Sequence, residues 1–345
     1  MPDISGFTKF VNNTELEHSI HIISELLELL IDSKTIDLEL VEIEGDALFM
    51  FTTNIPTYEQ LISLTSTMLD AFHMHIRRYE NMRICNCGSC KTTPNLELKF
   101  LVHYGDLAFI KVKNFVKPYG SDVIKIHRLL KNQIPVNEYI LFTNNTFNLY
   151  KDLLDTSWVK QQEIIDAVNI NYYYKTIEDS KNNSYPKNEE LSTKNLKIST
   201  PSFVLTKIIE TDIQTVYAYI SELKYRKLWD SAIKRVEYDA HKVNRRGTKH
   251  NCVLPMGNLK FETLNTTADD SMVYGEKTTD LLFTKNFIYF IKLKEVSTTK
   301  TSLELSLFVE FTTIGTFMKS SILKMLSKSW KKKFTSLQYL VENSM

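Results

Sequence analysis

The amino-acid sequence predicts a mixed α+β protein made of two domains, for three reasons. Apolar patterns in residues 1–177 follow the order β-α-β-β-α-β, and those in residues 200–345 give a strand, a helix, several strands and a long final helix. Residues 178–199 between them carry few apolar side chains and are typical of a polar linker. A chain of 345 residues is also too long for one ordinary hydrophobic core.

The elements of the first domain follow from the spacing of apolar residues. A helix is predicted over residues 13–31, where apolar side chains recur at intervals of three and four, namely Leu16, Ile20, Ile23, Leu27 and Leu30. Strands are expected at residues 36–42 and 47–51, separated by a Gly45-Asp46 turn. The further elements are a helix at 57–80, strands at 96–103 and 107–112, a helix at 122–131, a strand at 139–143, a helix at 145–154 and a strand at 171–176. This order fits a ferredoxin-like sheet with helices on one face.

Two carboxylates are placed at neighbouring strand ends by this arrangement. The segment Asp3-Ile-Ser-Gly-Phe-Thr-Lys-Phe opens the chain, and Glu42-Ile-Glu-Gly-Asp46 ends in the predicted hairpin turn. We therefore expect Asp3 and Asp46 to reach one hard cation, since Mg²⁺ and Mn²⁺ bind carboxylates together with substrate phosphates in phosphoryl chemistry. Taken singly, Asp3 is also explained as a strand-end cap and Asp46 as a plain turn residue.

At these residues the chain resembles the catalytic domain of class III nucleotidyl cyclases, the adenylate and guanylate cyclases. Two more segments continue the resemblance in the same order: Val102-His-Tyr-Gly105 resembles the family's H-x-G strand end, and Gly120–Arg128 resembles its G-x-x-V-N-x-A-x-R helix start. The four segments cover about residues 1–177. More narrowly, the domain is similar to a bacterial family of cyclase-related domains of unknown function, marked by the run His127–Asn132 and a cysteine cluster.

The resemblance implies roles for individual residues. Asp3 and Asp46 match the ligands of a two-metal site for Mg²⁺ or Mn²⁺. Arg128 matches the catalytic Arg that stabilises charge on the transferring phosphoryl group, a role suited to a delocalised guanidinium. The Asn that orients the ribose is replaced by Ile124, which can donate no hydrogen bond.

The base-reading positions are less regular. Glu42 matches the residue that reads the purine, and a carboxylate there implies guanine because it accepts from guanine N–H groups. Lys117 stands where the family has the helper of that residue and fits neither the guanine nor the adenine pattern. An alternative of equal weight is that Glu42 and Lys117 form an ion pair with each other in an inactive site.

Two functions follow from these matches. The first is a metal-dependent nucleotidyl cyclase that acts on a nucleoside triphosphate as a homodimer, with Asp3 and Asp46 from one subunit and Arg128 from the other. The second is a cyclase fold without catalysis, which holds a nucleotide or dimerises; Ile124 favours this second hypothesis, because positioning dominates phosphoryl transfer. Fold alone does not establish activity.

The start of the sequence bears on the first strand of that domain. Cyclase-like domains place a full apolar strand before the first metal Asp, and here only Met1-Pro2 precede it. Either the domain lacks that strand or Met1 is an internal methionine of a longer protein. The second interpretation is preferred, because a central strand is hard to omit.

Three cysteines stand within six residues, in Cys85-Asn-Cys87-Gly-Ser-Cys90. They could supply three ligands of a tetrahedral zinc site, with His73, His75, Cys252 or a water as the fourth. The alternative is a reduced loop whose cysteines are incidental.

Charge and cysteine use restrict the class of protein. Residues 1–180 carry a net charge of −8 and residues 181–345 a net charge of +9, so the acidic half is not expected to bind nucleic acid. No run of apolar residues is long enough for a transmembrane segment, and no secretory signal is visible at the start. Four cysteines, three of them crowded together, do not form a secreted disulfide framework, so a cytoplasmic location is expected.

The second domain is predicted from a strand at 202–209, a helix at 212–223 opened by an Asp212 cap, strands between 247 and 312, and a final helix at 315–341. This order, with Trp229 in the loop after the first helix, resembles the START-like, helix-grip superfamily of polyketide cyclases and plant allergen-like proteins over about residues 200–345. The resemblance implies an antiparallel sheet that grips the long helix around an apolar cavity for a hydrophobic small molecule. Side chains expected to line it are Trp229, Met318, Ile322, Met325 and Leu326.

Basic residues gather on the same final helix. Lys324, Lys328 and Lys331–Lys333 surround Trp330 and could form a lipid or phosphate patch. A solvated helix face is the preferred explanation, because exposed lysines need no special reason. For the predicted cavity, the alternative to ligand binding is that Phe, Tyr and Leu side chains fill it.

Overall fold

The computed structural model describes residues 1–12, 16–165, 167–177, 200–255, 257–264 and 271–343. Contacts divide the chain into two compact units, Met1–Glu80 with Cys87–Tyr185, and Asn81–Asn86 with Pro186–Met345. Each unit is described by itself below. The predicted linker at 178–199 lies outside the described residues.

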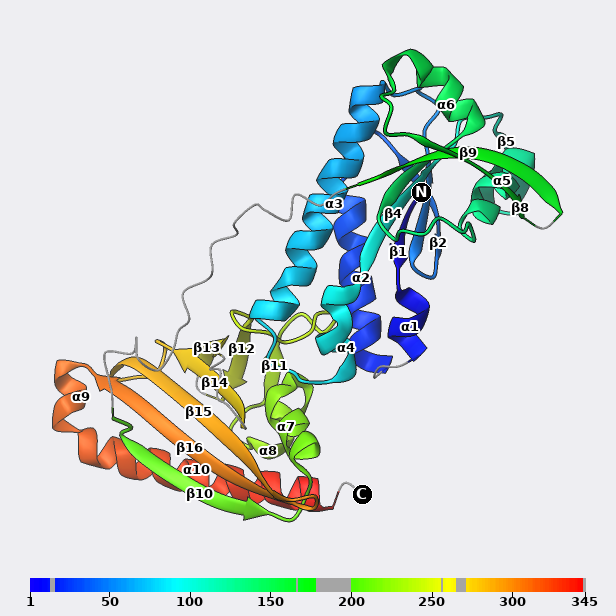
Figure 1. The fold of residues 1–345 in the computed structure, drawn as a ribbon. Helices are drawn as coiled ribbons and strands as arrows, with labels where there is room; N and C mark the ends of the chain where they lie inside the picture. Colours follow the sequence, from blue (N-terminus) through cyan, green and yellow to red (C-terminus); the bar gives the residue numbers. More distant parts are fainter. Residues whose placement is uncertain (13–15, 166, 178–199, 256, 265–270, 344–345) are drawn as a thin grey trace. The chain divides into compact units, whose positions relative to one another are not determined.

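The first unit is built on a seven-stranded sheet with the order β2-β3-β1-β4-β7-β9-β8 (Figure 1). Its strands are β1 (Pro2–Ser5), β2 (Glu39–Glu44), β3 (Ala47–Phe51), β4 (Glu97–Val102), β7 (Tyr139–Thr143), β8 (Val159–Ile165) and β9 (Val168–Thr176). Only β4 and β7 pair in parallel; the other neighbours are antiparallel. Strand β1 lies between β3 and β4, and of its four residues only Pro2 precedes Asp3.

A separate hairpin and the helices complete this unit. The hairpin consists of β5 (Ala108–Val112) and β6 (Phe115–Tyr119). The helices are α1 (Phe7–Asn12), α2 (Leu16–Asp32), α3 (Tyr58–Asn81), α4 (Gly88–Thr92), α5 (Ser121–Leu129) and α6 (Asn144–Tyr150), with 3₁₀ turns η1 (Thr93–Asn95) and η2 (Lys151–Leu153). Helices α2 and α3 lie side by side (Figure 1), and His75 Nε2 of α3 lies 3.0 Å from Glu25 Oε2 of α2.

The buried face of α2 differs from the predicted one. Leu16 and Ile20 are 66% and 52% exposed, while the helix buries Ile22, Ile23, Leu26, Leu27 and Leu30. Two overlapping sets of apolar residues share the 3.6-residue period in this segment, and periodicity alone did not choose between them. Packing against the sheet buries the set of residues that includes Ile22 and Leu26.

The second unit has a seven-stranded antiparallel sheet with the order β10-β16-β15-β14-β13-β12-β11. Its strands are β10 (Phe203–Ile209), β11 (Arg235–Glu237), β12 (Lys249–Leu254), β13 (Gly257–Leu264), β14 (Met272–Thr278), β15 (Thr284–Ser297) and β16 (Lys300–Phe311). Its helices are α7 (Ile213–Ser221), η4 (Leu223–Tyr225), α8 (Arg226–Trp229), α9 (Thr313–Phe317) and α10 (Lys319–Glu342). The predicted Asp212 cap is confirmed, since its carboxylate accepts from the Thr215 amide at 2.9 Å.

The long C-terminal helix packs its apolar stripe into the core of this unit, and this confirms the predicted combination of antiparallel sheet and final helix. The stripe consists of Ile322, Leu326, Trp330, Phe334, Leu337 and Val341. Two predicted members are wrong: Met318 and Met325 are 45% and 62% exposed. Met318 lies at the break between α9 and α10, and Met325 falls beside the stripe, whose spacing of four continues through Trp330.

No helix in the described part of the chain is both long and apolar enough to cross a membrane. The mixed α+β class is as predicted from the sequence. Strands β6, β8 and β11 and the short helices α1 and α4 were not predicted, because segments of three to seven residues carry too little periodicity to be recognised.

Candidate functional site

The structure brings Asp3 and Asp46 together. Asp3 is the second residue of β1 and pairs in register with Ala47 of β3, which directly follows the Gly45-Asp46 turn. The Ile4 amide donates to the Asp46 carbonyl at 3.2 Å, which fixes the turn against β1. The Asp46 side chain is hydrogen-bonded to Asp3, and Asp3 is only 6% exposed. Two carboxyl groups therefore share one partly buried position at the end of a hairpin.

The partly buried position of Asp3 and Asp46 disfavours ionisation of both carboxyl groups at once. Burial, followed by the charge of Asp3, raises the pKa of Asp46 to about 7. One cation is supplied by the protein, because Lys99 Nζ of β4 lies 2.8 Å from Asp3 Oδ2. The neighbouring Leu130 carbonyl also accepts from Lys99 at 3.3 Å. The pair of carboxyl groups and Lys99 thus carry one negative charge when both carboxyl groups are ionised.

The raised pKa predicts how stability depends on pH. A carboxyl whose folded pKa exceeds its unfolded value stabilises the fold below the unfolded pKa of about 3.9, and this contribution is lost as pH rises through about 7. Asp46→Asn cannot ionise, so without added divalent metal it should be more stable than wild type at pH 8, by about 1–2 kcal/mol after solvent screening. Denaturant unfolding at pH 5 and pH 8 measures this, and an advantage at pH 5 as large as at pH 8 would contradict it.

Glu42 and Lys117, the predicted base-reading residues, face each other across the sheet edge and the separate hairpin. Lys117 Nζ lies 3.5 Å from Glu42 Oε2, with the two side chains 59% and 42% exposed. A pair this exposed contributes less than about 1 kcal/mol, so it can open without much cost. An ion pair between Glu42 and Lys117 is what the hypothesis of an inactive site predicts. Recognition of a purine base by these two residues stays a prediction.

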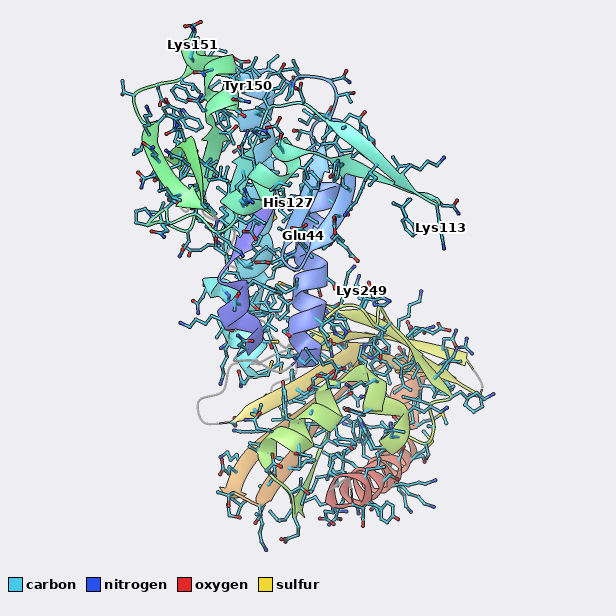
Figure 2. The ribbon with its side chains drawn as sticks, turned by 90° about the vertical axis from the view of Figure 1, so that its right-hand side faces the viewer. Glu44, Lys113, His127, Tyr150, Lys151 and Lys249 are labelled. Carbon is cyan, nitrogen blue, oxygen red and sulfur yellow. The ribbon has the colours of Figure 1, made fainter. Side chains whose placement is uncertain are left out.

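Helix α5 carries the remaining predicted site residues. Ile124, where the cyclase pattern has Asn, is 50% exposed and so points away from the core. Arg128 is half-buried near the end of the helix. Its neighbour His127 contacts β2: Nδ1 lies 2.9 Å from Glu44 Oε2 (Figure 2). Helix α5 is therefore attached to the strand that leads into the Asp46 turn.

The H-x-G segment has a structural role that the sequence did not reveal. His103 Nε2 lies 3.1 Å from Asp122 Oδ1 at the start of α5, and its Nδ1 lies 2.7 Å from Thr143 Oγ1. A Cβ atom at Gly105 would approach the Asp122 carboxylate to 2.5 Å, so this close approach requires glycine. The motif ties the ends of β4 and β7 to the start of α5.

A cavity of about 380 Å³ lies elsewhere in the first unit. It is bordered by the start of β1, by β3 and β4, and by α3, α5 and α6, and its lining includes Met1, Phe51, His103 and Tyr150. Neither Asp3 nor Asp46 lines it. The cavity is therefore separate from the carboxylate pair.

The three crowded cysteines meet a histidine that the sequence analysis did not select. Within the first unit, His18 Nδ1 lies 3.2 Å from Cys87 Sγ and 3.6 Å from Cys90 Sγ, and Cys85 stands two residues before Cys87 in the sequence. The predicted fourth ligands are wrong: His73 pairs with Glu138 at 2.7 Å, His75 pairs with Glu25 at 3.0 Å, and Cys252 is buried in the core of the second unit. His18 lies on α2, and only tertiary packing brings it to the cysteines.

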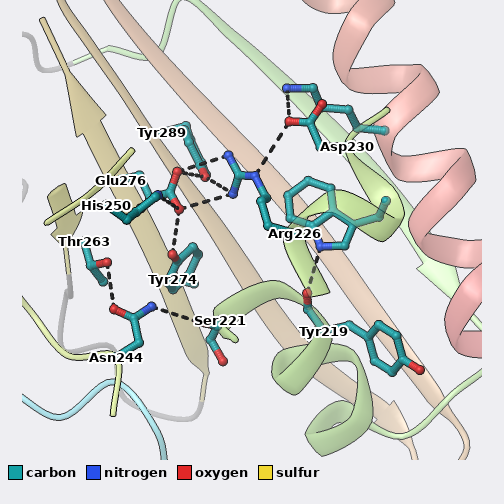
Figure 3. A network of polar contacts seen from close by, with 12 residues as sticks. Tyr219, Ser221, Arg226, Asp230, Asn244, His250, Thr263, Tyr274, Glu276 and Tyr289 are labelled. Atoms are coloured by element: carbon teal, nitrogen blue, oxygen red, sulfur yellow. Dashed lines mark hydrogen bonds and ion pairs between the residues drawn. The ribbon is translucent and has the colours of Figure 1, made fainter. Parts of the chain in front are cut away.

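The core of the second unit encloses a network of charged side chains (Figure 3). The Arg226 guanidinium donates to both oxygens of Glu276, at 3.2 and 3.1 Å, and to Tyr289 Oη at 2.7 Å. Tyr274 donates to Glu276 at 2.6 Å, and the Tyr289 hydroxyl also donates to this carboxylate. His250 Nε2 lies 3.4 Å from Glu276 Oε1.

A second carboxylate balances this network. Asp230 Oδ2 lies 3.6 Å from Arg226 Nε and 2.7 Å from Lys333 Nζ of α10. Burial alone would raise the pKa of Glu276, but the Arg226 charge, together with His250 and the hydrogen bond from Tyr274, outweighs burial and holds that pKa well below its usual range. Burial lowers the pKa of Lys333. Lys333 therefore belongs to a buried ion pair, and the prediction of a wholly solvated lysine face is wrong at this residue.

The predicted cavity residues of the second unit divide into two groups. Trp229 is buried, donates from Nε1 to the Tyr219 carbonyl at 2.8 Å and stacks under Arg226. Ile322 and Leu326 are buried in the same core, whereas Met318 and Met325 face solvent. A cavity of about 490 Å³ in this unit lies over β12, β13 and β14 and is lined mainly by polar residues, among them Lys249, Asn251 and Glu262. A ligand cavity beneath α10 stays a prediction.

Several important residues were missed in the sequence. Lys99, Arg226, Glu276 and His18 each act through a partner distant in the chain, so no local spacing marks them. One signal was available for Arg226, because it stands three residues before Trp229, which was predicted to line the cavity.

Comparisons with known proteins add two partial matches in sequence. The family model described as a protein of unknown function (DUF2652) matches residues 23–139, about a third of the chain, which include the cysteine cluster and His127–Asn132. An uncharacterized protein of Mycobacterium tuberculosis is 36% identical over 121 residues, which are 35% of this chain and 57% of that protein. The chain thus spans little more than half the length of this curated relative.

Solved structures give weaker similarities. A START superfamily protein from Mycobacterium smegmatis has 12% identity and a TM-score of 0.34, with 41% of this chain and 98% of that chain covered. Norcoclaurine synthase from Thalictrum flavum has 11% identity and a TM-score of 0.33, with 41% and 87% covered. A protein from Thermus thermophilus has 14% identity and a TM-score of 0.33, with 41% and 97% covered.

Proposed function

We propose that the first unit is a nucleotidyl cyclase-like domain that binds a divalent cation and a nucleoside triphosphate at Asp3 and Asp46. The observation that carries the proposal is the direct contact of these two carboxyl groups. Two carboxylates held together in a partly buried position repel each other, and a divalent cation with substrate phosphates removes that repulsion. Mg²⁺ or Mn²⁺ bound there would orient the triphosphate and polarise its phosphoryl oxygens.

The topology around the pair supports this proposal. The chain order β1-α2-β2-β3-α3-β4 places β1 between β3 and β4, as a ferredoxin-like, cyclase-type sheet requires. Asp3 then lies on the central strand and Asp46 on the adjacent hairpin turn. The His127–Glu44 contact at 2.9 Å holds α5, and Arg128 with it, against the strand that precedes this turn.

A homodimer is part of the proposal, because the cyclase resemblance implies that Arg128 acts on the partner subunit's nucleotide. The β5–β6 hairpin exposes a cluster of apolar side chains that suits such an assembly, namely Phe109, Val112, Phe115, Val116 and Tyr119, which are 51–80% exposed. Coupling to a hydrophobic ligand in the second unit stays a prediction from the sequence.

The second candidate is a cyclase fold that binds nucleotide without turnover. Two observations favour it: Lys99 already neutralises Asp3 at 2.8 Å, and the exposed Ile124 offers no hydrogen bond to a ribose. In this case the cation and the triphosphate bind, and no cyclic nucleotide forms.

Calorimetry and product analysis on the full chain distinguish these outcomes. We expect binding of Mn²⁺–GTP more tightly than Mn²⁺–ATP, with loss of at least roughly tenfold in affinity in Asp46→Asn, because one of two charged ligands is removed. Lys113→Met at the tip of the β5–β6 hairpin is the matched control and should bind as wild type does. Equal binding of GTP and ATP would remove the guanine assignment, and binding unaffected by Asp46→Asn would remove the metal site.

Mixing variants tests the shared site. If cyclic nucleotide is formed, Asp46→Asn and Arg128→Ala should each lose activity, and a mixture of the two should regain part of it. Such a mixture contains dimers with one intact site, because each variant supplies the residue that the other lacks. Binding without any product would select the second candidate, and activity in either single variant would contradict the residue roles.

A further inference from the structure

We infer that His18, Cys85, Cys87 and Cys90 form a structural zinc site, with His18 as the fourth ligand. This inference is independent of the proposed nucleotide site, because it shares no residue with it. Three thiolates and one imidazole are a donor set that zinc takes in closed, four-coordinate sites. His18, Cys87 and Cys90 belong to the first unit, and Cys85 stands two residues before Cys87 in the same Cys-x-Cys-x-x-Cys run.

The distances fit a tetrahedron. His18 Nδ1 lies 3.2 Å from Cys87 Sγ and 3.6 Å from Cys90 Sγ. With Zn–S and Zn–N bonds of about 2.3 and 2.0 Å, neighbouring sulfur and nitrogen ligands stand about 3.5 Å apart. A zinc ion therefore fits among these atoms with only small shifts. Cys90 is fully buried and His18 is 9% exposed, whereas Cys85 and Cys87 are partly exposed.

The backbone around the cysteines supports thiolate ligands. Cys87 precedes the short helix α4, and the Cys90 amide donates to Cys87 Sγ at 3.4 Å. A donated N–H stabilises a thiolate more than a thiol. Thr92 and Thr93 hydroxyls donate to the Gly88 and Ser89 carbonyls at 2.8 and 2.7 Å, which holds Cys90 in place. The Cys-x-Cys-x-x-Cys spacing thus presents three sulfurs to one point.

The position of His18 favours a zinc site over a disulfide. Helix α4 packs on α2, which carries His18 (Figure 1). A disulfide would join two of the thiols and leave the imidazole without a role, whereas the observed geometry brings His18 Nδ1 close to two sulfurs at once. None of the four cysteines in the chain is in a disulfide.

Metal analysis of the full chain, purified with zinc present and without chelator, tests the site. We expect about one tightly held zinc per chain, as a closed four-ligand site requires. His18→Ala should weaken zinc binding by on the order of a hundredfold, because one of four ligands is lost. His21→Ala, on the same helix and half-exposed, is the matched control and should keep the metal. Asp46→Asn should also keep it, which separates this site from the proposed nucleotide site.

Cobalt substitution gives a readout that does not depend on variants folding well. Co²⁺ in the wild-type protein should show the intense visible bands of tetrahedral coordination together with thiolate-to-cobalt charge transfer. His18→Ala should alter the visible bands and keep the charge transfer, because three sulfurs remain. Wild-type protein that binds no zinc or cobalt, or whose mass is lowered by the two hydrogens of a disulfide, would overturn the inference. An unchanged cobalt spectrum in His18→Ala would do the same.

Discussion

Glu276→Gln is expected to lower the free energy of unfolding by about 3–5 kcal/mol, the cost of leaving a buried charge without its partner. Glu276 is fully buried and accepts from Arg226, Tyr274 and Tyr289, so the neutral amide leaves Arg226 and Lys333 with Asp230 as their one shared carboxylate in this network. Chemical denaturation followed by circular dichroism at pH 7 measures the change. A loss below about 1 kcal/mol would show that the network contributes little to stability.

Two controls sharpen this expectation. Glu262→Gln removes a carboxylate on the neighbouring strand whose pair with Lys277, at 3.2 Å, is partly exposed, and it should cost less than about 1 kcal/mol. The double variant Arg226→Met with Glu276→Leu should recover most of the lost stability, since an apolar pair of similar volume replaces the ion pair.

Acid should abolish the same contribution. The depressed pKa of Glu276 means that its stabilisation is fully present above the unfolded value of about 4.3 and is lost as pH falls below it. The difference between wild type and Glu276→Gln should therefore shrink on acidification.

Lys99→Met is expected to make the stability of the first unit depend on divalent metal. The side chains of Lys99 and Asp3 are 16% and 9% exposed, and removing the ammonium leaves Asp3 beside Asp46 without the lysine that contacts it. Without metal the variant should lose about 3 kcal/mol, toward the lower end of the cost of breaking a buried pair. Millimolar Mn²⁺ should restore most of that loss, because a metal bound only by the folded state stabilises it.

Thermal melts with and without Mn²⁺ give the measurement. Lys111→Met, an exposed change on strand β5, should melt like wild type in both conditions. A variant that loses stability and gains nothing from Mn²⁺ would show that Lys99 serves the pair as a permanent cation and that no divalent ion binds there.

Regular elements were the part of the fold that the sequence predicted well. Strand β3 and helices α3, α7 and α10 were predicted to within a few residues, because each carries a long or uniform apolar pattern. The faces of helices were predicted less well. Leu16, Ile20, Met318 and Met325 share the helical period with buried residues, and only the shape of the neighbouring sheet decides which of them is covered.

The candidate sites show the same limit. Asp3 and Asp46 were found together because a strand end and the turn that leads into its neighbouring strand lie close in an antiparallel sheet. Lys99, His18 and the Arg226–Glu276 pair depend on contacts between elements far apart in the chain. No sequence motif marks these residues. They matter because they are buried, and the periodicity of apolar residues does not reveal which polar side chains are buried.

The contact between His18 and Cys87 joins positions 69 residues apart in the chain. Between them lie α2, β2, β3 and α3, which form much of the interior of the first unit. A bond between these two positions would close a loop in the unfolded chain and lower its conformational entropy. By the loop-closure estimate used for covalent cross-links, this would stabilise the fold by about 4 kcal/mol. Unlike a disulfide, a metal-mediated closure is reversed by a chelator. The assembly of these four elements would then respond to the supply of metal in the surroundings.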